Sequence, residues 1–270
     1  MIDRSRTQRP DSSPTNTDRG VSEVLGFILV FSIIFLSVGL LYTVGFQAMN
    51  DYQETEQLNN AERAMESLTD NFNDVLRYGG VNDRYGELTM REGTIAVDEG
   101  GTTVNIEVGD NGESIEERDN DLFNAYGEDG TIDLGEFSYT AHGDTIAYEG
   151  GGLVRADEDR SEWSTDLKQP QIRCEEGSAA SITLASVTAD DQSINPSDST
   201  GVTMTEINRD TKVYDNDEVT VQVEDDTEYE AAWESMVGSN GFDNEDNSLE
   251  GTCEADGDIV ITLVEVGFEY

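Results

Sequence analysis

The chain has 270 residues and a formal net charge of −44, because 59 acidic residues face only 15 Lys and Arg. Such a charge excludes sequence-independent binding to nucleic acid and repels anionic membrane surfaces. It also favours disorder, but 2 Trp, 10 Tyr, 9 Phe and several alternating apolar runs argue for a folded core.

The basic residues are biased as strongly as the acidic ones. Lys168 and Lys212 are the only lysines, and every other basic residue apart from the single histidine is arginine. Molar salt shortens the Debye length to about 3 Å, so a dense acidic surface is tolerated there. We therefore expect a halophilic protein.

An apolar run near the N-terminus predicts a membrane helix. Val24–Phe46 is 23 residues without a charge, long enough to cross a hydrocarbon core of about 30 Å. Four arginines precede the run and acidic residues follow it, so the positive-inside rule places the rest of the chain outside the cell. The alternatives are a buried core helix and a cleaved signal peptide, whose apolar region is normally shorter.

An amphipathic pattern continues this helix beyond the membrane. Apolar residues repeat at steps of three and four: Leu58, Ala61, Met65, Leu68, Phe72 and Val75, with Leu76 beside the last. Gly79 and Gly80 predict the C-terminus, giving one helix over Val24–Tyr78, approximately 80 Å long. The stripe either packs on the following domain or bundles with other subunits, and both arrangements can coexist.

The segment DRGVSEVLGFILVFSIIFLSVGLLYTVG, from Asp18 to Gly45, resembles the N-terminus of haloarchaeal type IV pilin-like proteins. In such proteins the charged leader ends in a basic residue and a small residue, and Arg19 and Gly20 fit that place. The resemblance therefore implies that a prepilin peptidase cuts the chain after Gly20, leaving Val21 as the new N-terminus and keeping the apolar helix. Gly20, beside a charged pair, disfavours helix and suits an extended scissile bond.

The same resemblance gives Glu23 a role in assembly. In pilins an acidic residue near the mature N-terminus, usually at the fifth position, pairs with a neighbour's terminal amine; Glu23 lies earlier and either plays this part or marks the membrane boundary. The implied partners are other pilin subunits and the pilus assembly machinery. The later stretches NNAERAMESLTDNFNDVLRYG, DTIAYEGGGLVR and DDTEYEAAWESM also resemble such proteins.

Beyond about Val81 the period changes to that of strands. The strand-like runs are 86–90, 94–97, 102–108, 136–140, 145–148, 153–156, 182–187, 202–207, 219–223 and 259–266. Gly150, Gly151 and Gly152 predict a hairpin. One short helix is expected around Trp233, which we interpret as a core residue, with acidic residues and Thr227 at its start and Gly238 at its end.

The expected fold is therefore α+β, with a long transmembrane and stalk helix and a β-rich, sandwich-like antiparallel outer domain. The expected segments are a charged leader (1–20), a transmembrane helix (21–50), its amphipathic continuation (51–80) and an acidic extracellular domain (81–270).

Cys174 and Cys253 both follow the membrane segment, and a disulfide is the natural expectation in an oxidising compartment. Two free buried thiols remain an alternative, as does a metal site, although His142 has no partners at ligand spacing. The acidic groups Asp119 with Asp121, and Asp243 with Glu245 and Asp246, do not fit an EF-hand loop.

No catalytic, cofactor or metal motif occurs in the sequence. The leading hypothesis is a pilin-like subunit or minor pilin in the cytoplasmic membrane, assembled into a surface filament through its helix. The alternatives are a single-pass surface protein for adhesion, sensing or envelope structure, which does not polymerise, and an anchored enzyme built on carboxylates or tyrosines.

Overall fold

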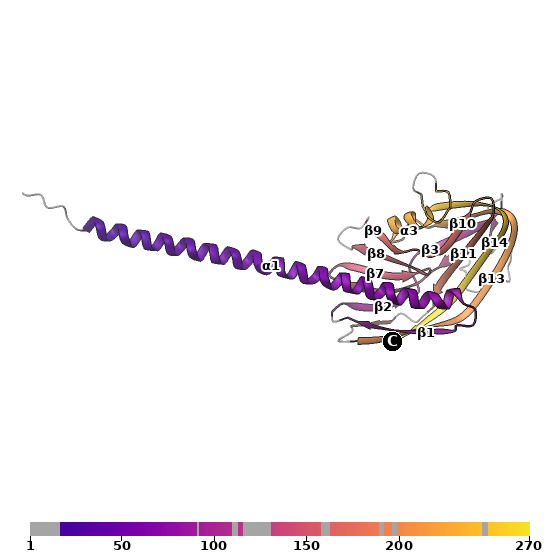
Figure 1. Cartoon of the computed structure of the whole chain (residues 1–270), viewed down its shortest axis with the longest axis horizontal. Helices are drawn as coiled ribbons and strands as arrows, with labels where there is room; N and C mark the ends of the chain where they lie inside the picture. The colour runs from indigo at the N-terminus through magenta and orange to yellow at the C-terminus, as the bar shows by residue number, and fades with distance from the viewer. Residues whose placement is uncertain are drawn as a thin grey trace, which may run out of the picture. The chain divides into compact units, whose positions relative to one another are not determined.

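The computed structural model describes residues 17–90, 92–109, 113–115, 131–157, 163–188, 192–195, 199–244 and 248–270. These residues form a long N-terminal helix, two β-sheets and a short helix, which confirms the expected α+β fold (Figure 1). The chain divides into two compact units, Met1–Thr55 and Glu56–Tyr270. The boundary falls inside the long helix, so its two halves belong to different units.

Helix α1 spans Thr17–Arg77. Its end agrees with the prediction, but it begins at Thr17 rather than Val24, so Gly20, which was expected to disfavour helix, is itself helical. One glycine costs a helix about 1 kcal/mol. Extending a helix that is already nucleated closes one further backbone hydrogen bond per residue, which offsets that cost.

The strands form two sheets. Sheet A runs in the order β10 (Gln171–Glu175), β11 (Ala179–Val187), β14 (Glu250–Glu269), β13 (Ser199–Val223), β3 (Thr103–Val108) and β4 (Glu113–Ser114), with β1 (Asp83–Thr89) also paired to β13 and β5 (Thr131–Asp133) to β3. Sheet B runs in the order β12 (Gln192–Ile194), β2 (Thr94–Asp98), β6 (Glu136–Ala141), β7 (Asp144–Glu149), β8 (Gly152–Asp157) and β9 (Ser164–Lys168). Among these strands, every pairing is antiparallel except that of β11 with β14.

Each predicted strand-like run overlaps an observed strand. The runs 202–207 and 219–223 turn out to be parts of one strand, β13, whose polar middle stretch pairs along β14. Backbone pairing with a neighbour, rather than apolar alternation, holds that stretch extended. The prediction missed five strands, all of them short and with few apolar residues: β4, β5, β9, β10 and β12.

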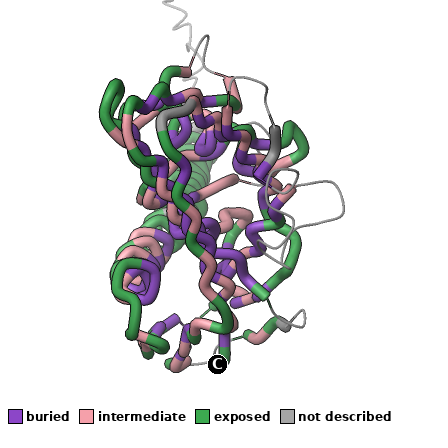
Figure 2. Tube along the Cα trace, turned by 90° about the vertical axis from the view of Figure 1, so that its right-hand side faces the viewer, coloured by how far each residue is buried: buried purple, intermediate pink, exposed green. Residues whose placement is uncertain are grey.

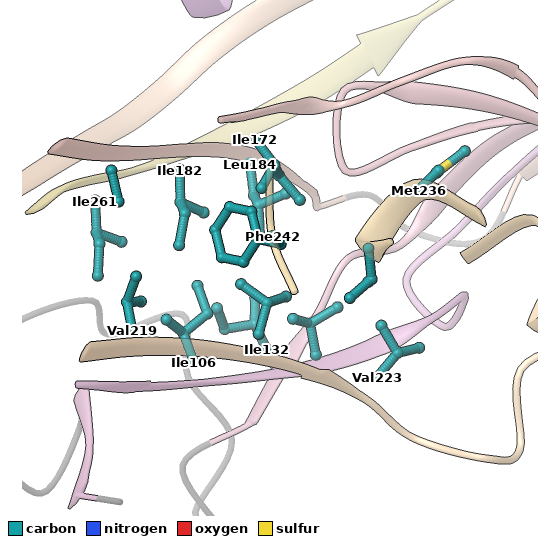
Figure 3. Close-up of a cluster of buried hydrophobic side chains, with 14 of the residues drawn as sticks. Ile106, Ile132, Ile172, Ile182, Leu184, Val219, Val223, Met236, Phe242 and Ile261 are labelled. Atoms are coloured by element: carbon teal, nitrogen blue, oxygen red, sulfur yellow. The ribbon is translucent and has the colours of Figure 1, made fainter. Parts of the chain in front are cut away.

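Two hydrophobic cores fill the second unit. The α3 core takes side chains from β10, β11 and β14 on one side and from β3, β5 and β13 on the other, with Phe242 between them (Figure 3). The α1 core joins residues 61–76 of α1 to sheet B and to the last residues of β14. Neighbouring residues of β7 serve different cores, because Ala147 faces the α3 core whereas Ile146 and Tyr148 face the α1 core. Figure 2 shows the resulting alternation of buried and exposed residues along the strands.

The glycine hairpin predicted between two strands is the turn joining β7 to β8. Gly150 and Gly151 have φ values of 59° and 90°, the left-handed region that two-residue hairpin turns require. A Cβ at Gly150 would lie 3.2 Å from the Trp233 ring, and one at Gly151 would lie 2.8 Å from Leu76 of α1. The turn therefore fits closely between the two helices.

Helix α3 spans Glu230–Val237 and buries Ala232, Trp233 and Met236. Trp233 is fully buried in the α3 core, which confirms its predicted place. Tyr229 is the N-cap residue and makes no side-chain cap hydrogen bond; its backbone N–H donates instead to Thr227 Oγ1, at 3.2 Å.

Candidate functional site

The first half of α1 is an exposed apolar helix. Every residue from 21 to 50 is exposed, and the helix is apolar and long enough to cross a membrane. Its rings form pairs along the helix: Phe31 with Phe35 at 4.5 Å between centroids, and Tyr42 with Phe46 at 6.0 Å. Ser32 and Thr43 donate hydrogen bonds to carbonyls of the preceding turn. The hydroxyls of Ser32 and Thr43, within the charge-free run, are therefore satisfied by the helix itself without water.

The processing residues suggested by the sequence lie in the first turns of this helix. Arg19, Gly20 and Val21 are helical, and so is Glu23. Glu23 is exposed, as is Val21. Residues 1–16 of the expected leader lie outside the described residues.

The second half of α1 is buried along one side. All seven residues of the predicted stripe are less than 9% exposed, and Phe72 and Val75 are fully buried. Phe72 meets Phe268 at 5.3 Å and Tyr148 at 5.9 Å between ring centroids. The stripe therefore packs on the β-rich domain that follows it in the chain, which was the first of the two predicted arrangements.

Polar contacts fix the same half of the helix. Asn73, itself buried, donates to the Gly151 carbonyl at 2.9 Å and accepts from the Tyr148 hydroxyl at 3.2 Å. Arg209 of β13 donates to the carbonyls of Val75 and Leu76 at 2.5 and 3.1 Å. These carbonyls have no intrahelical donor at a helix C-terminus, so Arg209 serves as the cap.

Cys174 of β10 and Cys253 of β14 form a disulfide, with 6.0 Å between their Cα atoms and a sequence separation of 79 residues. Both cysteines lie in the α3 core, whereas the buried stripe of α1, which includes Met65 and Phe72, lies in the α1 core. A cavity of about 720 Å³ opens beside the disulfide. Glu176, Glu218 and Glu250 are among its lining residues.

A buried polar cluster, which we call the Glu149 cluster, comprises Glu149, Glu136, Thr102, Tyr229 and Trp233. Glu149 is fully buried at the end of β7 and accepts hydrogen bonds from Thr102 Oγ1 at 2.8 Å, from the Thr102 N–H at 3.2 Å and from Trp233 Nε1. The Tyr229 hydroxyl donates to Glu136 at 2.7 Å. Sequence reasoning missed this cluster, because its glutamates are indistinguishable from the many surface carboxylates.

Burial sets the electrostatics of the cluster. Loss of solvent raises the pKa of Glu149 to about 7, and the neighbouring Glu136 adds to the rise, whereas the hydrogen bonds from Trp233 and Thr102 oppose it. The pKa of Glu136 is also raised, chiefly by burial. Two adjacent acids with raised pKa values are a feature of functional sites and of structural networks alike.

The remaining candidates do not assemble into a site within the part of the chain that the structure describes. Among the described residues no group of three His, Cys, Asp or Glu could hold a metal. His142 lies 3.1 Å from Gln57 Oε1 and 3.9 Å from Glu92. Asp119, Asp121, Glu245 and Asp246 lie outside the described residues.

Comparison with known proteins gives one match. No curated protein and no solved structure matches the chain significantly. Residues 19–269 match the family described as DUF7289, a family of unknown function. The match begins in the first turn of α1 and extends through the last strand, so it covers most of the first unit and nearly all of the second. The chain belongs to the DUF7289 family.

Proposed function

We propose that the chain is a type IV pilin-like subunit or minor pilin, anchored in the cytoplasmic membrane with its β-rich unit outside the cell. The observation that carries the proposal is the contrast within α1. One half exposes an uninterrupted apolar surface, whereas the other half is built into a β-rich domain. Exposed apolar surface of this extent marks a membrane or protein interface.

Two further observations support this topology. Arginines precede the apolar helix and acidic residues follow it, the asymmetry that keeps an N-terminus cytoplasmic. The Cys174–Cys253 disulfide favours an oxidising compartment for the β-rich unit, because cytosolic thiols are usually kept reduced.

The proposed assembly uses residues 21–55 alone. After cleavage between Gly20 and Val21, for which the first turns of α1 must unwind, the apolar helix moves from lipid into a bundle of equivalent helices. Glu23 then pairs with a neighbouring subunit's terminal amine. Prepilin peptidase, other pilin subunits and the assembly machinery are the partners of this scheme.

A specific observation favours a second function, a single-pass surface protein that does not polymerise and serves adhesion, sensing or envelope structure. The stripe over residues 58–76 is consumed within the chain's own domain, so it offers no seam for bundling. Helix packing between subunits is then restricted to the segment before Glu56.

The proposal is tested by mapping the mature N-terminus of protein from native membranes, with and without the cell's prepilin peptidase. Pilin-like processing gives a chain that starts at Val21 only when the peptidase is present. A leader that remains intact in both cells contradicts the proposal and leaves the plain membrane anchor. A start beyond Gly45 would reduce the segment to a signal peptide.

Assembly is tested separately by cross-linking. The two native cysteines are joined to each other, so Ser37→Cys adds a single free thiol on the exposed half of α1, and Ser67→Cys adds one on the exposed side of the other half. A filament subunit gives dimers through Ser37→Cys in sheared fibres and few through Ser67→Cys. A surface protein that does not polymerise gives no fibres and no dimers from either.

A further inference from the structure

The Glu149 cluster lies where three parts of the second unit meet. Glu149 ends β7 of sheet B, Thr102 immediately precedes β3 of sheet A, and Trp233 belongs to α3. The hydrogen bonds from Thr102 and Trp233 converge on the one carboxyl of Glu149.

The turn that follows Glu149 connects this cluster to α1. Gly150 lies against Trp233 on one side, and Gly151 lies against Leu76 on the other. Asn73 of α1 donates to the Gly151 carbonyl at 2.9 Å. A displacement of the β7–β8 turn therefore changes contacts with both helices at once.

Among the described residues, the charged groups that act on Glu149 and its neighbours are all acidic. The negative charge of Glu136 on β6 helps to raise the pKa of Glu149. The charges of both glutamates and of Glu228 in turn help to raise the pKa of Tyr229, at the start of α3. The negative charge of Asp98 on β2 helps to raise the pKa of Glu136. A cavity of about 270 Å³ beside the cluster is lined by Asp98, Gly101, Glu136, Asp226, Thr227, Glu228 and Tyr229, so water can reach it.

We propose that the Glu149 cluster is a pH-operated latch, in which protonated Glu149 holds α3 and the β7–β8 turn against both sheets and ionised Glu149 releases them. The neutral carboxyl of Glu149 accepts the hydrogen bonds from Thr102 and Trp233 without placing a charge in the protein interior. Loss of the proton to solvent leaves a buried carboxylate beside Glu136, which is costly in a medium of low dielectric constant. Admission of water through the adjacent cavity relieves that cost and loosens α3. The latch does not depend on membrane insertion or filament assembly.

Trp233 reports directly on the latch, because its indole N–H donates to Glu149. The chain has only 2 Trp, and Trp163, which is 38% exposed, is an internal reference. We expect the ¹⁵N indole resonance of Trp233 in the full chain, held in detergent micelles, to shift with a midpoint near pH 7, while that of Trp163 stays in place. A Trp233 resonance that is constant from about pH 5 to 9 would overturn the latch.

Three variants assign the transition. Glu149→Gln keeps an acceptor and an uncharged group, so its Trp233 resonance should stay near the low-pH position at every pH. Glu136→Gln removes a neighbouring negative charge and should move the midpoint to lower pH. Glu230→Gln, at an exposed position on the same helix, should keep the wild-type midpoint. A transition that persists in Glu149→Gln would contradict the assignment.

Release is measured separately from titration. Amide protection factors of residues 230–237 should fall about tenfold across the transition in the wild type, and should not change in Glu149→Gln. Protection around Met65 should not change in either protein, because Met65 lies in the α1 core. A titrating Trp233 with unchanged α3 protection would show that Glu149 ionises without acting as a latch.

Discussion

The two halves of α1 have the same backbone structure and opposite environments. Residues 21–50 are exposed on every side, whereas the half that follows Glu56 buries its apolar stripe completely, with Met65 and Phe72 at 1% and 0% exposure. The difference lies in the sequence pattern, because the first half is apolar all round and the second half is apolar at every third or fourth residue. The backbone is helical in both halves, and the pattern of apolar side chains determines whether a half is buried against the β-rich domain or left exposed.

The comparison predicts that equivalent substitutions in the two halves affect different properties. Phe72→Ala removes a fully buried ring and should lower the free energy of unfolding of the second unit by about 3 to 5 kcal/mol. Phe31→Ala, at a position that is 51% exposed, should leave that free energy unchanged. Denaturant unfolding of the full chain in micelles, followed by Trp fluorescence, measures both. Similar losses in the two variants would show that the halves are not independent.

The reverse test places a charge on each half. Leu36 is 71% exposed, and Leu36→Arg should weaken membrane insertion by about 3 kcal/mol while the unfolding of the second unit stays as in the wild type. Ser67→Arg, on the exposed side of the other half, should alter neither. Flotation with lipid vesicles measures the bound fraction. Equal binding by Leu36→Arg and the wild type would mean that this segment does not hold the chain in the bilayer.

Sequence reasoning was accurate where a regular pattern carried the information. The stripe from Leu58 to Leu76 and the hairpin at Gly150 follow from helical spacing and from the φ values that tight turns require, so both were predictable. The Glu149 cluster was not predictable, because its members come from four places in the chain and only folding distinguishes a buried glutamate from a solvated one. The start of α1 was misplaced because the local effect of Gly20 was overestimated relative to helix propagation.

The pH response should belong to the second unit alone. The folded-state pKa of Glu149, about 7, lies above the unfolded value of about 4.5, so its contribution to stability is fully present below pH 4.5 and is lost as the pH rises through 7. The loss should reach at most about 3 kcal/mol. Unfolding free energies measured from pH 4 to 9 should show this slope in the wild type and a shallower one in Glu149→Gln, with vesicle binding insensitive to the variant. Equal slopes would refute the assignment to Glu149.

The smallest effect is expected at the end of α1, where Arg209 caps the helix from β13. Its guanidinium contacts the carbonyls of Val75 and Leu76 and forms an ion pair with Glu206 at 2.7 Å. Arg209→Gln cannot keep all of these bonds, and the site is partly exposed, so we expect a loss of about 1 to 2 kcal/mol. Arg77→Gln changes an exposed arginine in the last turn and should cost under about 0.5 kcal/mol. Equal stabilities of the two variants would mean that packing of the stripe alone, without its cap, fixes this half of the helix to its domain.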